Sequence, residues 1–219
     1  MDKLKHDEVP PVFDTPAGWK EAREIQSALV ACYARESNPT DHSAKPSGVR
    51  RAYHNLDHVF AVNNVLLNMY PYIQDMRLFL YMGWFHDCHY NTRSAKGVNE
   101  EFSGQLAYNM LTAAGLPKCD ALFVQAGITA TSEHPQSRVF GPIIDADLSI
   151  LASNHEDYVR YTNQLRKEYR WCSPQQWRDG RREWINSMLA RKHIYCLGEN
   201  RALWEKQARH NLLFEHLSL

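Results

Sequence analysis

Apolar residues recur at intervals of three and four along most of this chain, which is the spacing of helices that bury one face. Such stripes cover residues 19–33 and residues 55–70, and Pro71 follows the second. Residues 36–52 are polar and contain proline and glycine, so a loop is expected there. Residues 76–85 are apolar on almost every side, which favours a helix at the centre of a bundle over the alternative of a short buried strand.

The second half of the chain repeats this pattern and carries recognisable helix ends. Asn99 with two acidic residues after it predicts a helix start, and Gly115 predicts a helix end. Ser173 before a proline predicts another cap. The helices predicted here are residues 99–114, 117–131, 154–171, 174–190 and 201–217, with 140–152 as a short helix or the entry to one. Strand signals are nearly absent, so the sequence predicts an all-α helical bundle.

The length of the chain and the absence of a long linker predict a single domain. Residues 1–18 contain three prolines and are expected to form an extended N-terminal arm. No internal repeat or long linker divides residues 19–219, and 219 residues suffice for one ordinary domain.

Composition and charge exclude several classes of protein. Lys plus Arg and Asp plus Glu number 25 each, so the chain lacks the basic excess that is typical of nucleic-acid or membrane-surface binding. No apolar run approaches the roughly 18 to 20 residues of a membrane span, and the polar N-terminus does not resemble a signal peptide. The five cysteines form no CxxC pair, which predicts free thiols and a cytoplasmic location.

Eleven histidines are many for this length, and several stand beside aspartates. Histidine is the commonest transition-metal ligand, so these clusters are candidates for a metal site. His86 and Asp87 follow ten apolar residues, where polar groups without partners are costly to bury. A buried ion pair or a capped helix end is the alternative, and His6-Asp7 in the polar arm shows that the dipeptide alone is uninformative.

Two further clusters add histidine and carboxylate. His54 and His58 stand four apart and share a face of a predicted helix, although such pairs also occur by accident on surfaces. Asp145 and Asp147 lie in an apolar segment, where a helix cap and an exposed acid are the ordinary explanation. Together, two imidazoles and two carboxylates suit Mn²⁺, Fe²⁺, Co²⁺, Ni²⁺ or Mg²⁺. An open position beside such an ion generates hydroxide and polarises a phosphoryl oxygen.

The order of His58, His86-Asp87 and Asp147 resembles the HD superfamily of metal-dependent phosphohydrolases, which are all-α. The resemblance covers nearly all of the chain after residue 18. Its motifs are YHNLDHV (53–59), WFHDCHY (84–90), NEEFSGQLA (99–107), ITATSEH (128–134), DADLSIL (145–151), RKEYR (166–170), GRREWINSMLARKHIY (180–195) and ARHNL (208–212). The YHN-x-x-H and ADLS strings are also similar to the cyclic nucleotide phosphodiesterases, a distant branch.

This resemblance implies a role for each clustered residue. The implied metal ligands are His58, His86, Asp87 and Asp147, with Asp87 also assigned to catalysis. By similarity to the phosphodiesterases, His54 donates a proton to the leaving oxygen, with exchanged roles for His54 and His58 as the alternative. Asp147 matches the aspartate of ADLS, whereas Asp145 is expected to support the ligands without binding the metal ion itself. The HD-x-x-H pattern is not kept, because His89 stands one position too close, so the number of ions stays open.

Other polar residues complete the predicted site. Glu101, or its neighbour Glu100, is expected to act as general base, the alternative being an acid that favours a helix start. Arginine holds phosphate through paired hydrogen bonds, which makes the arginines of the C-terminal half candidates. The substrate contacts chosen are Arg181, Arg209, Tyr195 and His134.

The expected function is metal-dependent hydrolysis of a nucleotide or another small phosphate ester. One alternative is an HD-type di-iron oxygenase, which would need His89 and His134 as extra ligands. The other is a nucleotide-binding regulator without catalysis. Neither nucleic acid nor a membrane is an expected partner, and a homo-oligomer is left open.

Overall fold

The computed structural model describes residues 19–33 and 51–219 of the chain. The predicted N-terminal arm, residues 1–18, and most of the predicted loop at 36–52 lie outside these ranges. Within them the structure contains nine α-helices, one short 3₁₀ helix and no strand, which confirms the all-α bundle.

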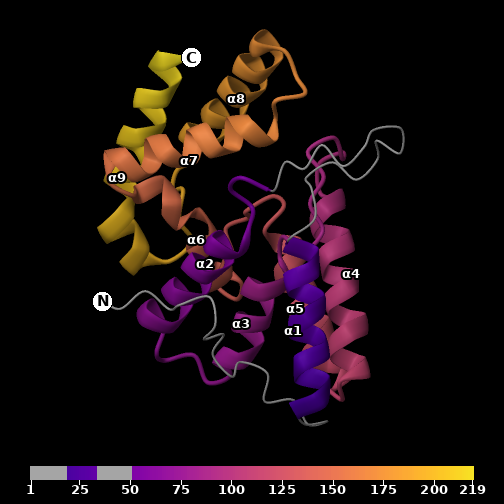
Figure 1. The fold of residues 1–219 in the computed structure, drawn as a ribbon. Coiled ribbons are helices and arrows are strands. Elements are labelled where there is room, and N and C mark those ends of the chain that lie inside the picture. The colour runs from indigo at the N-terminus through magenta and orange to yellow at the C-terminus, as the bar shows by residue number, and fades with distance from the viewer. Residues whose placement is uncertain (1–18, 34–50) are drawn as a thin grey trace.

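The first six helices form one group, shown at the bottom of Figure 1. They are α1 (Trp19–Tyr33), α2 (Leu56–Met69), α3 (Met76–Phe85), α4 (Val98–Ala113), α5 (Lys118–Ala130) and α6 (Gly141–Asp147). The centre of this N-terminal helix group is α3, which packs against α2, α4, α5 and α6. Eight of its ten residues are buried, which confirms a central helix and excludes the short buried strand.

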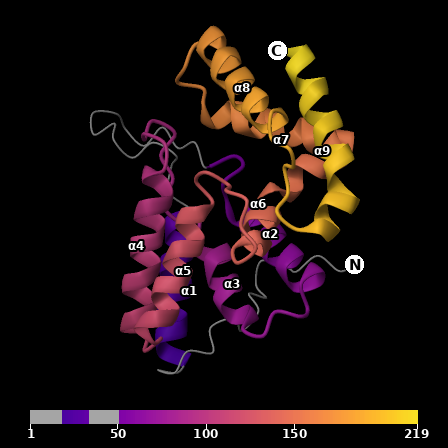
Figure 2. The same cartoon turned by 180° about the vertical axis from the view of Figure 1, so that it is seen from behind.

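The remaining elements form the C-terminal helix group, shown from both sides in Figures 1 and 2. They are η1 (Leu148–Ala152), α7 (His155–Glu168), α8 (Pro174–Leu189) and α9 (Gly198–Ser218). The group has its own apolar core, built around side chains such as Leu151, Leu165 and Ile185. Because η1 continues directly from α6, the two groups meet at the end of α6, beside the start of α2.

The helix starts explain how polar residues reach this junction. Asn55 caps α2, and its Oδ1 accepts hydrogen bonds from the backbone N–H groups of Asp57 (2.8 Å) and His58 (3.3 Å). This cap places His58 in the first turn of α2. Ser173 and Gln176 form a reciprocal capping box at the start of α8, where the sequence predicts a cap.

Two predicted helix starts are displaced. The prediction of Asn99 as a cap is wrong, because α4 begins at Val98, after Gly97 with a left-handed φ of 83° that glycine adopts without strain. Asn99 instead pairs through its side chain with the backbone of Asn91. The last helix begins at Gly198, earlier than the predicted residue 201. Among the described residues, none of the helices combines the length and apolarity that a membrane crossing requires.

Candidate metal centre and adjoining cavities

Imidazole and carboxylate groups from α2, the end of α3 and the end of α6 converge at the junction of the two helix groups. The Nε2 atoms of His58 and His86 lie 3.1 Å apart. Oδ1 of Asp147 lies 3.2 Å from Nε2 of His58 and 3.6 Å from Nε2 of His86. His58, His86 and Asp147 thus form a group that could hold a metal ion.

Asp87 borders the same group from the other side of His86. Its Oδ2 lies 3.1 Å from His86 Nε2 and 3.5 Å from His58 Nε2. Neighbouring ligands of an ion with bonds of about 2.1 Å are separated by roughly 3.0 to 3.4 Å. The spacings of 3.1 and 3.2 Å match the edges of such a coordination shell, and those of 3.5 and 3.6 Å are slightly longer. The structure therefore brings the predicted ligands His58, His86 and Asp147 into one candidate group and places the fourth, Asp87, beside its two histidines.

The tautomer of His86 suits a metal ligand. Its Nδ1 lies 2.9 Å from the carbonyl oxygen of Gly83, which accepts hydrogen bonds only, so Nδ1 carries the proton. In the neutral ring, Nε2 then presents its lone pair to the cluster. Gly83 also allows α3 to approach α2 closely, since a Cβ there would lie 2.6 Å from Oδ1 of Asn63.

Electrostatics make the cluster a site for positive charge. Burial opposes ionisation of Asp87 and Asp147, but the surrounding imidazoles hold the pKa of both carboxyls below the usual range. Burial also opposes the charge on His58, yet the same carboxylates raise its pKa to about 9. Two ionised carboxylates therefore face two imidazoles, and the negative charge that favours a proton on His58 would equally favour a divalent cation in its place, for which carboxylate and imidazole are suitable ligands.

His54 stands beside the cluster and is held in one orientation. Its Nδ1 donates to Oε2 of Glu168 at 2.6 Å, and its ring stacks on Tyr90 with centroids 3.9 Å apart. The other oxygen of Glu168 accepts from the backbone N–H groups of Tyr53 (2.8 Å) and His54 (3.0 Å). Burial opposes ionisation of Glu168, but His54 and these N–H groups hold the pKa of the carboxyl below its ordinary value.

Sequence reasoning missed Glu168 and Arg51 as parts of this site. Glu168 lies in RKEYR, but that motif gives no sign that its carboxylate reaches His54 from α7. Arg51 is buried, and its guanidinium donates to the carbonyl oxygens of Asp87 (2.5 Å) and Cys88 (3.1 Å). The arginine thereby fixes the turn that carries Asp87, and its position three residues before His54 is the only hint in the sequence.

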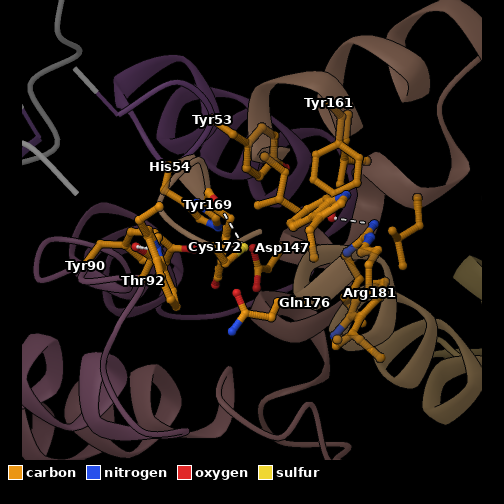
Figure 3. A pocket seen from close by; sticks show the side chains of 18 of the residues that line it. Tyr53, His54, Tyr90, Thr92, Asp147, Tyr161, Tyr169, Cys172, Gln176 and Arg181 are labelled. Carbon is orange, nitrogen blue, oxygen red and sulfur yellow. Dashed lines mark hydrogen bonds between the residues drawn. The ribbon is translucent and has the colours of Figure 1, made fainter. Parts of the chain in front are cut away.

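A cavity of about 490 Å³ opens beside the cluster, in the range of small-molecule sites. We call it the aromatic cavity, because seven tyrosines and tryptophans line it. They are Tyr53, Tyr90, Tyr161, Tyr169, Trp171, Trp177 and Trp184. Figure 3 shows Asp147 near its centre, with His54 and Tyr90 on one side and Arg181 on the other.

A second cavity of about 590 Å³ also borders Asp147, and we call it the polar cavity. Its lining includes His58 and the polar side chains of Asn55, Ser149, Ser153 and Gln164. The two cavities share four lining residues, which are Tyr53, Asp147, Ile150 and Tyr161. Asp147 is also the most exposed of the four clustered residues, at 18% of its side chain. The cluster is thus reached through its Asp147 edge.

The predicted substrate residues divide between the cavity and the core. His134 lines the aromatic cavity and contacts Asp147 through Nε2 at 3.1 Å, from a backbone with a left-handed φ of 45°. Arg181 also lines this cavity, but it is buried and paired with Glu215 at 2.7 and 3.0 Å. Its charge is therefore already balanced.

The assignments of Arg209 and Tyr195 to the substrate are wrong. Arg209 donates to the carbonyl oxygens of Leu189, Arg191 and Lys192 at the end of α8, and it lines neither cavity. Tyr195 is fully buried, and its hydroxyl donates to the carbonyl oxygen of Leu148. Both side chains serve the packing of the C-terminal helix group.

Two predicted acids also lie elsewhere than expected. Glu101 is exposed in the first turn of α4, which contradicts its role as general base. Its neighbour Glu100 is partly buried. Burial raises the pKa of the Glu100 carboxyl, and the negative charges of Asp87 and Asp147 raise it further. Asp145 is fully buried and accepts from the N–H groups of residues 196 and 197, so it fixes that loop and does not support the cluster.

Comparisons with protein-family models, with curated proteins and with solved structures find no match to this chain.

Proposed function

We propose that this protein is a metal-dependent phosphohydrolase that cleaves a small phosphate ester, as the resemblance to the HD superfamily implies. The observation that supports the proposal best is the cluster in which the Nε2 atoms of His58 and His86 lie 3.1 Å apart and each lies 3.1 to 3.6 Å from a carboxylate oxygen of Asp87 and of Asp147. An oriented histidine and a cavity of ligand size adjoin this cluster. Together these features supply a metal site, a proton donor and room for a substrate.

The metal ion would be held by the side chains of residues 58, 86, 87 and 147. When bound, such an ion supplies a water of lowered pKa and a Lewis acid for a phosphoryl oxygen. The donor set suits Mn²⁺, Fe²⁺, Co²⁺, Ni²⁺ or Mg²⁺, and it contains no thiolate that would select structural zinc.

His54 is the proposed general acid. Because Nδ1 donates to Glu168, the remaining ring nitrogen Nε2 is the one that can deliver a proton to a leaving oxygen. The Glu168 carboxylate accepts from Nδ1 and keeps the ring oriented, so Glu168 is a positioning residue. His54 lines the aromatic cavity, whereas His58 does not, which favours His54 as acid and His58 as ligand over the exchanged roles.

Glu100 replaces Glu101 as the candidate general base. A carboxyl of raised pKa at the edge of a cluster of negative charges can accept a proton from an attacking water. His134, through its contact with Asp147, helps to hold the most exposed ligand in place.

The proposal is tested by metal analysis of the purified protein, followed by assays of phosphate release with Mn²⁺, Co²⁺, Ni²⁺ or Mg²⁺. The substrates are a panel of nucleotides and a generic diester. We expect one or two ions per chain and hydrolysis that stops when a chelator removes them. A protein that binds no metal would refute the proposal.

The two rival functions predict other results of the same assays. A di-iron oxygenase would bind two irons and show a visible absorption band under oxygen. Of its two candidate extra ligands, His134 contacts Asp147, whereas the ring of His89 packs against Phe102. A regulator would bind nucleotide without turnover under any of the metals.

A further inference from the structure

The two cavities together restrict the shape of the substrate. Both border Asp147, so a phosphorus atom bound at the cluster has room for one substituent in the aromatic cavity and another in the polar cavity. A phosphate monoester carries one substituent and would leave the second cavity without a role. A linear diester carries two separate substituents and fits both.

The position of His54 decides which substituent leaves. His54 lines the aromatic cavity and not the polar one, and it is the proposed donor of a proton to the leaving oxygen. The leaving group therefore occupies the aromatic cavity. Tyrosine and tryptophan side chains bind planar rings through stacked and edge-on contacts, so a planar aromatic group suits this cavity.

The charges of the cavity walls exclude a highly charged substrate. The described lining of the two cavities contains one arginine each and no lysine. Arg181 is paired with Glu215, and Arg160 in the polar cavity is paired with Asp157 and with Glu156. A monoester at pH 7 carries nearly two negative charges and a polyphosphate carries more, whereas a diester carries one. Charge without a partner is costly to bury, which favours the diester.

We propose that the substrate is a linear phosphodiester with an uncharged aromatic group on its leaving oxygen and an uncharged polar group on the other. This inference rests on the proposed function. In the reaction, the oxygen of water bonds to phosphorus and the bond from phosphorus to the aromatic group's oxygen breaks. The leaving oxygen takes its proton from His54, and the proton lost by the water passes to Glu100 and from there to solvent. The products are an aromatic alcohol and a phosphate monoester.

The test compares two esters with the same leaving group. Thymidine 5′-(4-nitrophenyl phosphate) is a diester, and 4-nitrophenyl phosphate is the matching monoester; both release 4-nitrophenol, which is measured by absorbance. With the metal-loaded protein, and after correction for the uncatalysed rates, we expect kcat/KM to be at least tenfold higher for the diester. Titration calorimetry with the metal-loaded His54→Ala variant, in which turnover is expected to be slow, should show at least tenfold tighter binding of the diester.

A substitution in the polar cavity separates the two substituents. Ala61 is an exposed residue of α2 that lines only this cavity, so Ala61→Phe fills space without disturbing the core. We expect it to lower the diester-to-monoester ratio at least tenfold, in both kcat/KM and binding. The control is Ala202→Phe, at an exposed position of α9 that lines neither cavity, and it should leave the ratio unchanged.

A substitution in the aromatic cavity tests the leaving group. Trp177→Leu removes one ring of the lining, and we expect it to raise KM at least fivefold for both esters, since both carry the 4-nitrophenyl group. Trp204→Leu in α9 is the matched control, because Trp204 packs against Tyr195 outside both cavities.

The possible outcomes separate this inference from the proposed function. Hydrolysis with equal or better use of the monoester would overturn the inference and leave the proposed function intact. A third outcome is that neither ester is hydrolysed, that the diester nevertheless binds more tightly, and that Ala61→Phe removes this preference. That outcome would refute the proposed function and support a diester as the ligand. Absence of both hydrolysis and binding would overturn both.

Discussion

The two helix groups contribute different parts of the candidate site. The N-terminal group provides all four clustered side chains, from α2, α6 and the end of the central α3. The C-terminal group provides Glu168 and most of the aromatic wall, from helices with a separate core. The two groups are connected by hydrogen bonds such as those that Glu168 accepts from residues 53 and 54 and the one that Trp171 donates to Thr92. On the proposed function, the metal would thus be held by the N-terminal group, whereas Glu168 and most of the aromatic wall come from the C-terminal group, so the two contributions can be disturbed separately.

The largest effect is expected from removing a ligand in the N-terminal group. Asp87→Ala deletes a carboxylate that contacts both His86 and His58, so we expect loss of bound metal and of all measurable hydrolysis. Helix content by circular dichroism should persist, because α3 keeps its apolar contacts. Asp179→Ala in α8, an exposed carboxylate bonded to Gln175, is the control and should keep both metal and activity. Metal content equal to wild type in Asp87→Ala would refute the ligand assignment.

The next largest effect is expected at the contact between the groups. His54→Ala removes the proposed acid without touching the ligands, so the protein should keep its metal while turnover falls by 10² to 10⁴, the usual contribution of general acid catalysis. His58→Ala should lose the metal instead. Elemental analysis and kcat of the two variants provide the test, and the opposite pattern would mean that the two histidines exchange roles.

A substitution within the C-terminal group should affect stability and leave metal binding intact. Arg181→Met removes the partner of Glu215, whose carboxylate then keeps, among the described residues, only the hydroxyl of Tyr158 as a side-chain partner at 2.6 Å. An unpaired buried charge costs about 3 to 5 kcal/mol, which we expect as the loss in the free energy of unfolding by urea. Stoichiometric metal in the folded variant is also expected. Loss of metal would show that the two groups are not separable.

The connection through Glu168 should make stability depend on pH. Its pKa in the folded protein is below the ordinary value, so the ionised carboxylate stabilises the fold fully above about pH 4.5, and this contribution is lost as the pH falls through the folded-state pKa. Glu168→Gln should lower the free energy of unfolding at pH 7 by about 1 to 3 kcal/mol. The free energy of unfolding of this variant should also fall less steeply than that of the wild type as the pH is lowered, which is measured by urea unfolding between pH 7 and pH 3. A decline as steep as in wild type would contradict this origin.

The sequence predicted the N-terminal half of the site better than the C-terminal half, for a physical reason. His58 and Asp147 lie next to helix ends that have local signals, such as the cap at Asn55, and helix periodicity identifies α3 as the buried centre. The contact of Glu168 with His54 joins residues far apart in the chain, and no local pattern encodes it. The same holds for Arg209, whose partners are carbonyl groups at the end of another helix.

The smallest effect is expected at Glu101, where sequence and structure disagree about a single position. Glu100 and Glu101 are adjacent acids of the first turn of α4, and an α-helix turns neighbouring side chains about 100° apart, so only one can face the cluster. Glu100 is the more buried of the two, and burial together with the charge of Asp87 raises the pKa of its carboxyl, so we take Glu100 as the candidate. Glu101→Gln should therefore change kcat by less than about twofold and the free energy of unfolding by less than about 0.5 kcal/mol. Glu100→Gln should lower kcat at least tenfold with the metal retained. Equal effects of the two substitutions would mean that neither carboxylate acts as the base, and the proton of the attacking water would then pass to solvent alone.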